Sequence, residues 1–206
     1  MHEWSIWQTA LQLDRFRIEM QIEIVDRRNV STADARRIAE LLCTVWQKPG
    51  VTVDSRVAEM CGAWQAYRGP EAQFPRSFVI RTGDTVIAHA EVCPRTIGTS
   101  AGELTVAALA AVCTDPSVRG KGFGGRLVRK ACQLVDDGDF PVVLFQNFAN
   151  VQPFYEKLGA RAVDNRFVNS LAADGQANPF WADVAMVYST NQDWPSGVVD
   201  LRGPGF

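Results

Sequence analysis

Glycine and basic residues are concentrated in the segment VCTDPSVRGKGFGG, residues 112–125. Its last six residues include four glycines, interleaved with Lys121 and Phe123 and preceded by Arg119. A strand that runs into such a turn and then a helix forms an anion cradle, because the free N–H groups of the first helical turn and the helix dipole favour negative charge. The segment predicts a pyrophosphate site over residues 119–125, although a plain tight turn can have the same composition.

Two common phosphate loops fit this segment poorly. A Walker loop requires Gly-Lys followed by Ser or Thr, and that tripeptide is absent from the sequence. A dinucleotide-binding loop requires GxGxxG and usually an acidic residue at the end of the next strand. Here the spacing is GxGxG, and the next apolar run ends in Gln146 and Asn147. Nicotinamide binding is therefore disfavoured.

The surrounding sequence predicts the elements that position this loop. Apolar periodicity and turn residues indicate strands at 21–27, 77–82, 85–92, 104–113, 142–147, 160–168 and 182–189, and helices at 31–47, 54–67, 125–137 and 151–158. We expect an α/β fold with a mixed sheet of six to seven strands flanked by about four helices. A single domain over 1–206 is expected, in which residues 1–19 fit no element and Met20 is an alternative start.

Composition limits the function classes. With 47% hydrophobic residues and a net charge of -2, the chain predicts a globular domain with no general attraction to nucleic acid or a membrane. Its five cysteines are odd in number and lack CxxC spacing, which favours reduced thiols and a cytoplasmic location. Only two histidines occur, so we expect no metal site.

Two segments carry a resemblance to a known family. DPSVRGKGFGGRL, followed about thirty residues later by PFYEKLGARAV, resembles the GNAT superfamily of acyl-CoA-dependent N-acyltransferases. The first segment is similar to the family's pyrophosphate loop, Q/R-x-x-G-x-G/A, at residues 119–124. The second is similar to its FYEKLGF signature, with Ala160 in place of an aromatic residue. The resemblance covers residues 20–190 and implies a GNAT-type fold.

The resemblance implies acetyl-CoA, or another acyl-CoA, as the co-substrate. The implied cofactor-binding residues are Val112, Cys113, Thr114, Arg119, Gly120, Lys121, Gly122, Phe123, Gly124, Gly125 and Asn150. Main-chain groups of 112–114 would pair with the pantetheine arm, and Asn150 would bond that arm or cap the following helix. Tyr155 matches the family tyrosine that protonates the departing thiolate; packing under the sheet is its plainer role.

The general base is harder to assign. Many relatives carry a glutamate at the position that Val106 occupies here, and Ala108 and Ala110, which share its face of the strand, cannot act as bases. We expect a water relay, fed by His89 or Glu103, to take the amine proton. His89 is also explained as a hydrogen-bonded core residue.

The segments AHAEVCPRT and DWPSGVVDLRGPGF resemble NodA-type nodulation acyltransferases and, more loosely, aminoglycoside 2'-N-acetyltransferases. This implies that residues 190–206 pack near the acceptor site and that the acceptor is a small-molecule amine such as an amino sugar. Alternatives are acetylation of a peptide or protein, and a non-catalytic acyl-CoA sensor. A homodimer through the tryptophans at 4, 7, 46 and 64 is a further expectation.

Overall fold

The computed structural model describes residues 21–190 and 194–206. The alternative start at Met20, the extension 1–19 and two of the tryptophans lie outside the described residues. The α-helices of the described chain are α2 (Thr32–Val45), α3 (Val53–Gly62), α4 (Phe123–Asp136) and α5 (Gln152–Glu156). Its strands are β1 (Ile22–Asp26), β2 (Arg76–Thr82), β3 (Thr85–Thr99), β4 (Gly102–Thr114), β5 (Val143–Asn147), β6 (Arg161–Val163), β7 (Arg166–Val168), β8 (Val184–Tyr188) and β9 (Val198–Asp200).

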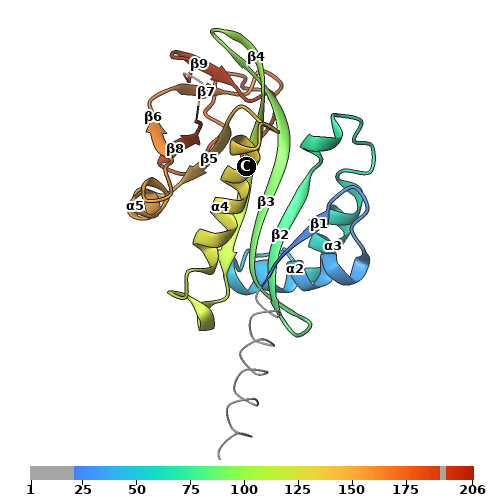
Figure 1. Cartoon of the computed structure of the whole chain (residues 1–206). Coiled ribbons are helices and arrows are strands. Elements are labelled where there is room, and N and C mark those ends of the chain that lie inside the picture. The colour runs from blue at the N-terminus through green and yellow to red at the C-terminus, as the bar shows by residue number, and fades with distance from the viewer. Residues whose placement is uncertain (1–20, 191–193) are drawn as a thin grey trace, which may run out of the picture.

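One mixed sheet runs in the order β1-β2-β3-β4-β5-β8-β6, and β9 joins β3 to β7 (Figure 1). Most neighbours are antiparallel, whereas β4 and β5 are parallel because α4 connects them across one face. The long hairpin of β3 and β4 forms the centre of the sheet. The predicted α/β fold is confirmed.

Local sequence explains where the helices begin. Ser31 caps α2 by accepting a hydrogen bond from the N–H of Asp34, and Thr52 forms a capping box with Ser55 at the start of α3. The N-cap of α4 is Gly122, in the left-handed conformation at φ 82° and without a side-chain cap.

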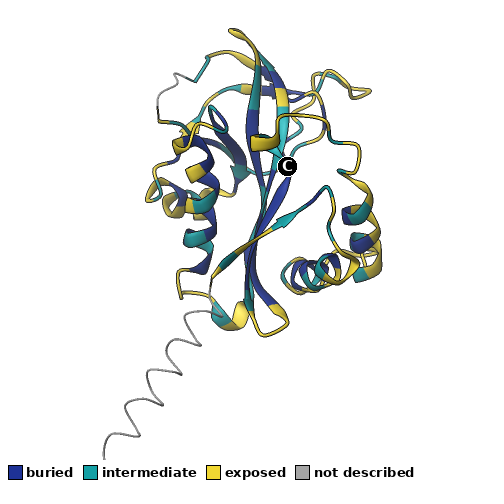
Figure 2. Ribbon diagram, turned by 45° about the vertical axis from the view of Figure 1, so that its right-hand side comes forward, coloured by how far each residue is buried: buried dark blue, intermediate teal, exposed yellow. Residues whose placement is uncertain are grey.

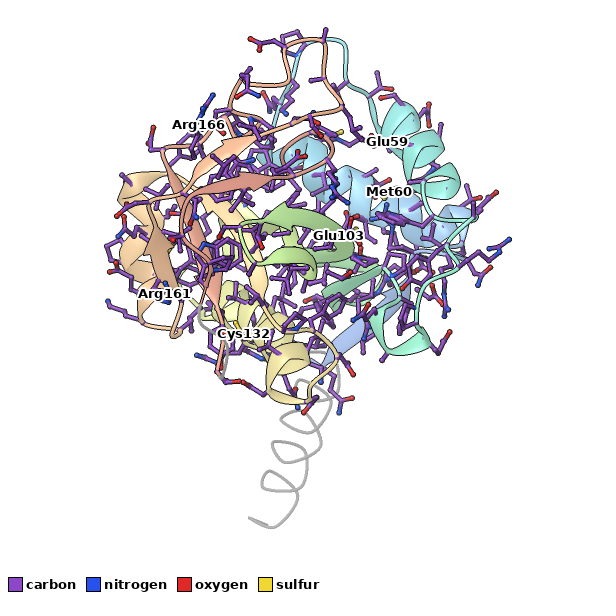
Figure 3. The ribbon with its side chains drawn as sticks, turned by 90° about the horizontal axis from the view of Figure 1, so that it is seen from above. Glu59, Met60, Glu103, Cys132, Arg161 and Arg166 are labelled. Atoms are coloured by element: carbon purple, nitrogen blue, oxygen red, sulfur yellow. The ribbon has the colours of Figure 1, made fainter. Side chains whose placement is uncertain are left out.

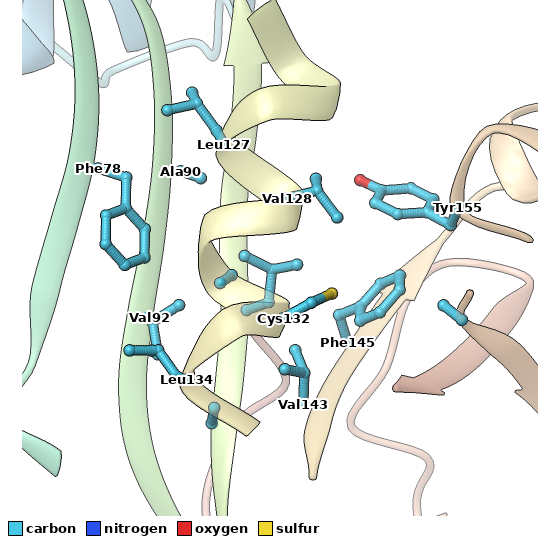
Figure 4. Close-up of a cluster of buried hydrophobic side chains, with 14 of the residues drawn as sticks. Phe78, Ala90, Val92, Leu127, Val128, Cys132, Leu134, Val143, Phe145 and Tyr155 are labelled. Atoms are coloured by element: carbon cyan, nitrogen blue, oxygen red, sulfur yellow. The ribbon is translucent and has the colours of Figure 1, made fainter. Parts of the chain in front are cut away.

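The core has one layer on each face of the sheet. α4 packs on one face against β2 to β5, and α2 and α3 pack on the other against β2, β3 and β4. Figure 2 shows the buried residues following the central strands, and Figure 4 shows Leu127, Val128 and Leu134 of α4 among the first layer. The helices therefore fix β4 from both sides.

Several predicted boundaries were wrong. α3 ends at Gly62 instead of residue 67, and α4 begins at Phe123, so Gly124 and Gly125 belong to its first turn. The described sheet has nine strands, because the predicted strand 160–168 is two short strands, β6 and β7, and because β9 was missed. Strands of three residues carry too little alternation to be recognised.

Candidate active site

A cavity of about 1070 Å³ opens beside β4, past the point where β4 and β5 stop pairing. The register of these two strands contains only Ala107 with Val143 and Ala108 with Leu144. From Leu109 to Thr114, β4 forms one wall of the cavity, and Phe145 to Phe148 form another. Unpaired strand edges offer main-chain hydrogen-bonding groups to an extended ligand.

β4 has an irregularity inside this wall. His89 pairs with Cys113 and Glu91 pairs with Ala110, so β4 advances three residues where β3 advances two. The extra residue produces a β-bulge, at which Ala111 adopts a left-handed φ of 51°. This conformation is costly for a residue other than glycine, by about 1–2 kcal/mol. The bulge lies at the middle of the cavity wall.

The start of α4 forms one end of the cavity. Arg119, Gly120, Gly122 and the first helical turn line it, and no side chain caps the free N–H groups of that turn. Helix N–H groups left in this way bind anions. Lys121 is exposed and lies outside the wall. Every other predicted loop residue, together with Val112, Cys113 and Thr114, lines the cavity.

Tyr155 lies on α5 and lines the same cavity, with its ring 4.6 Å from that of Phe145 and 4.9 Å from that of Phe154. In Figure 4 its hydroxyl end points toward α4, beside Val128. Burial raises the pKa of Tyr155 to about 12. The phenol therefore stays protonated at neutral pH.

Two asparagines differ in their position relative to the cavity. Asn150 is exposed, does not line the cavity, and does not cap α5, whose N-cap is Val151 without a side-chain bond. Asn147, at the end of β5, lines the cavity, is buried, and has no hydrogen-bond partner for either amide atom. A buried amide without a partner in the protein is costly, and a group with donor and acceptor atoms in the cavity would satisfy it. The amide pair Gln146–Asn147 at the strand end was the available sequence signal.

Five further aromatic side chains line the cavity, and one of them, Phe154, lies against the first turn of α4 near Gly124 and Gly125. The five are Trp46, Phe148, Phe154, Trp181 and Phe206, and the first four are exposed. The side chain of Gln146 connects the loop at 181–182 to residue 206. It accepts hydrogen bonds from the N–H groups of Trp181 and Ala182 and donates to the backbone oxygen of Phe206. Periodicity could not reveal this group, because its members come from α5, from the segments that follow α2 and β5, from the loop before β8 and from residue 206.

The charged side chains that line the cavity, among the residues described, are all basic. Lys48, Arg56 and Arg119 line the cavity, and none of its described lining residues is Asp or Glu. Val106, the position at which relatives carry a glutamate, is fully buried in a separate cluster with β5 and β9. The wall of this cavity, among the residues described, therefore offers no side-chain carboxylate as a base.

The residues expected to feed a water relay lie elsewhere. His89 is completely buried on β3, and burial lowers its pKa. Glu103, labelled in Figure 3, lies in the β3–β4 hairpin and forms an ion pair of 2.6 Å with Arg202. Neither side chain lines the cavity. The structure brings Tyr155 and the loop together but not these two residues.

Over residues 21–190 and 194–206, no group of three or more His, Cys, Asp or Glu side chains could hold a metal ion. None of the helices described there has the length and apolar character needed to cross a membrane. The five cysteines are free thiols.

Comparisons with known proteins place this geometry in a family. Residues 26–163 match the model of the acetyltransferase (GNAT) domain. No curated protein matches the sequence. Among solved structures, the GNAT N-acetyltransferase YhbS from Escherichia coli, in complex with CoA, is similar at a TM-score of 0.59 and 15% identity, over 88% of this chain and 89% of that one.

Two further structures share the fold. Glucosamine-6-phosphate N-acetyltransferase from Arabidopsis thaliana has a TM-score of 0.52 and 19% identity, over 68% of this chain and 90% of that one. A GCN5-related N-acetyltransferase from Kribbella flavida has a TM-score of 0.52 and 17% identity. The match covers 71% of this chain but only 34% of the Kribbella flavida chain. With the cavity, the helix N-terminus and the family match together, the chain belongs to the GNAT family and is an acyl-CoA-dependent N-acetyltransferase.

Proposed function

We propose that the chain transfers the acetyl group of acetyl-CoA to a primary amine of a small molecule. The observation that carries this proposal is the single cavity of about 1070 Å³, which joins the uncapped start of α4 to an aromatic wall. One end suits a diphosphate, and the other suits a compact organic acceptor. The β4 bulge lies between them, where acyl group and amine would meet.

The residues present fit acetyl-CoA. The N–H groups of Gly120 to Gly125 and the guanidinium of Arg119 would hold the diphosphate. Main-chain groups of Val112 to Thr114 would pair with the pantetheine arm, and the unpartnered amide of Asn147 would bond it from the opposite wall. When bound, acetyl-CoA supplies an acyl group activated as a thioester.

Few side chains are needed for the transfer itself. A bond forms between the amine nitrogen and the acyl carbon, and the carbon–sulfur bond breaks. Tyr155 donates its proton to the departing sulfur and takes a proton back from solvent after the thiol leaves. The amine gives its proton to water, since the described wall holds no Asp or Glu side chain. Positioning and main-chain N–H donors supply most of the acceleration.

What we call the acceptor wall comprises the aromatic residues Trp46, Trp181 and Phe206 with Lys48 and Arg56, and it limits the class of amine that would bind there. Flat faces of Trp46, Trp181 and Phe206 suit the apolar face of a ring, including that of an amino sugar. The wall combines Lys48 and Arg56 with no described Asp or Glu side chain, which disfavours acceptors of several positive charges such as aminoglycosides. We therefore expect an amine with one positive charge on a ring-sized body, with glucosamine as a test compound.

Thiol release from acetyl-CoA with a panel of amines tests the proposal. Glucosamine, phenethylamine and cyclohexylamine represent singly charged acceptors, whereas kanamycin and spermidine represent polycations and a lysine-containing peptide represents protein substrates. Faster release with the singly charged small amines supports the proposal. Release only with the peptide, or tight acetyl-CoA binding without release for any amine, contradicts it.

A further inference from the structure

His89 occupies a position that the transfer chemistry above does not use. Its side chain is completely buried on β3, next to the bulge of β4. The ring Nδ1 lies 2.9 Å from the carbonyl oxygen of Ala111, the residue with left-handed φ. The ring Nε2 lies 3.0 Å from the hydroxyl oxygen of Ser77. Both ring nitrogens therefore have partners.

The chemistry of these partners fixes the tautomer. A carbonyl oxygen only accepts hydrogen bonds, so Nδ1 must carry the proton that it shares with Ala111. Nε2 then accepts a hydrogen bond from the hydroxyl of Ser77. The charged groups behind this contact are Arg27, which lies 3.4 Å from the Ser77 oxygen, and Glu91, which pairs with Arg27 at 2.8 Å. The ring is held at both ends in its neutral form.

Holding this carbonyl also sets the next amide. The described chain has no cis peptide, so the C=O of Ala111 and the N–H of Val112 point in opposite directions across one planar peptide unit. Because the carbonyl is directed to His89, the N–H of Val112 lies on the opposite side of β4 from that ring. Val112 lines the cavity, beyond the last pair between β4 and β5.

We propose that His89 is a positioning residue, whose Nδ1–H holds the Ala111 peptide so that the N–H of Val112 is aimed at the acyl oxygen of the bound thioester. A main-chain donor placed in this way stabilises the negative charge that develops during acyl transfer. His89 acts through the backbone, since it does not line the cavity. The inference rests on the proposed function and assigns a role to a residue outside the site.

The tautomer can be measured without any ligand. His2 and His89 are the only histidines, so a His2→Asn variant leaves His89 alone in a ¹⁵N spectrum of labelled side chains. We expect a neutral ring with the proton on Nδ1 at pH 7. A proton on Nε2 would overturn the proposal, because Nδ1 could then donate nothing to Ala111. This readout also holds if a substitution of His89 prevents folding.

The consequence for the acyl group is measured with bound acetyl-CoA labelled with ¹³C at its carbonyl. Three variants are compared with the natural chain: His89→Leu removes the donor, His89→Asn places an amide N–H near the position of Nδ1, and Val92→Ala destabilises β3 without touching the bulge. Infrared spectroscopy reports the carbonyl stretch, and calorimetry reports affinity. The Val92 side chain is fully buried in the layer under α4, which makes it a matched control for lost stability.

We expect His89→Leu to shift the carbonyl stretch back toward its value in water and to lower kcat by roughly 10- to 100-fold, a fraction of what loss of a complete oxyanion donor costs. Acetyl-CoA affinity should change less than about threefold, because the diphosphate cradle is untouched. His89→Asn should recover most of both signals, and Val92→Ala should alter neither. An unchanged stretch in folded His89→Leu contradicts the inference, whereas absence of acetyl-CoA binding to the natural chain contradicts the proposed function instead.

Discussion

The two ends of the cavity differ in the kind of chemical group that they present to a ligand. The cofactor end, residues 109–114 and 118–125, presents mainly backbone, shaped by a bulge and a helix start. The acceptor end presents side chains: Trp46, Gln146, Trp181 and Phe206. Backbone recognises what all CoA esters share, whereas side chains can change without disturbing the fold. The difference indicates that donor affinity and acceptor choice are separable in this protein, and four experiments test it.

Replacing Gly122 by valine should have the largest effect on acetyl-CoA binding. A β-branched residue is strained at the φ of 82° that Gly122 adopts, so the start of α4 must rearrange. We expect acetyl-CoA affinity to fall about 100-fold, equal to the loss of one or two charge-assisted hydrogen bonds. Gly138→Val is the control, because Gly138 has φ 83°, equally open surroundings, and a place at the far end of the same helix. Titration calorimetry showing equal losses in both variants would reject the cradle.

Replacing Tyr155 by phenylalanine should come next, with an effect on the rate instead of on affinity. Loss of the proton donor should lower kcat by about 100-fold, at the lower end of what a general acid contributes. Acetyl-CoA affinity should stay within a factor of about two, because the ring and its packing remain. Tyr188→Phe is the control, since burial raises the pKa of Tyr188 to about 12 as well, but this residue bonds Asp136 and lies outside the cavity wall. Equal rates in both variants would remove Tyr155 from the acid role.

Truncating Trp181 to alanine tests the acceptor end. Its side chain is 66% exposed, so folding should be little affected. We expect the KM of the amine to rise about tenfold, typical of losing one aromatic contact, with acetyl-CoA affinity unchanged. Leu171→Ala, at a position 75% exposed in the preceding loop and outside the wall, should leave both quantities unchanged. If Trp181→Ala instead weakens acetyl-CoA binding, the two ends are not separable.

The smallest expected effect is on how the free energy of unfolding depends on pH, and it concerns His89, next to the bulge between the two ends. Burial lowers the pKa of His89 below its ordinary 6.5, so the unfolded chain binds a proton that the folded chain resists. The free energy of unfolding should therefore decrease as the pH falls below about 6.5, by at most about 1.4 kcal/mol per pH unit. His89→Asn should flatten this dependence in urea titrations between pH 7 and 5. Parallel curves for the two proteins would contradict the assignment.

The segment predicted to bind the diphosphate lines the cavity, whereas Trp46, Phe148 and Trp181 were not predicted to line it, and the reason is physical. A glycine cluster between a strand and a helix leaves a continuous signal, because local backbone conformation is encoded locally. The acceptor wall is assembled from the segment after α2, from α3, from the loop before β8 and from residue 206, whose meeting depends on tertiary packing. Asn147 and Gln146 were visible only as two amides at a strand end.

The bulge in β4 could not be predicted from the sequence pattern. Ala110 and Ala111 continue an apolar run without a break, and nothing in their side chains marks the extra residue that β4 carries opposite β3. The strand was predicted correctly, but its most functional residue pair was indistinguishable from its neighbours. His89 was predicted as part of a relay, and only its contact with Ala111 reveals a different use.

The amide of Gln146 joins three main-chain groups from two separate stretches, the loop at 181–182 and residue 206. A random library at Trp181 and Trp46 that leaves Gln146 intact should yield variants with altered acceptor preference at undiminished expression. The same library built on Gln146→Ala should mostly yield proteins whose loop has lost its anchor, so this one glutamine sets how readily the enzyme can be redirected to new amines.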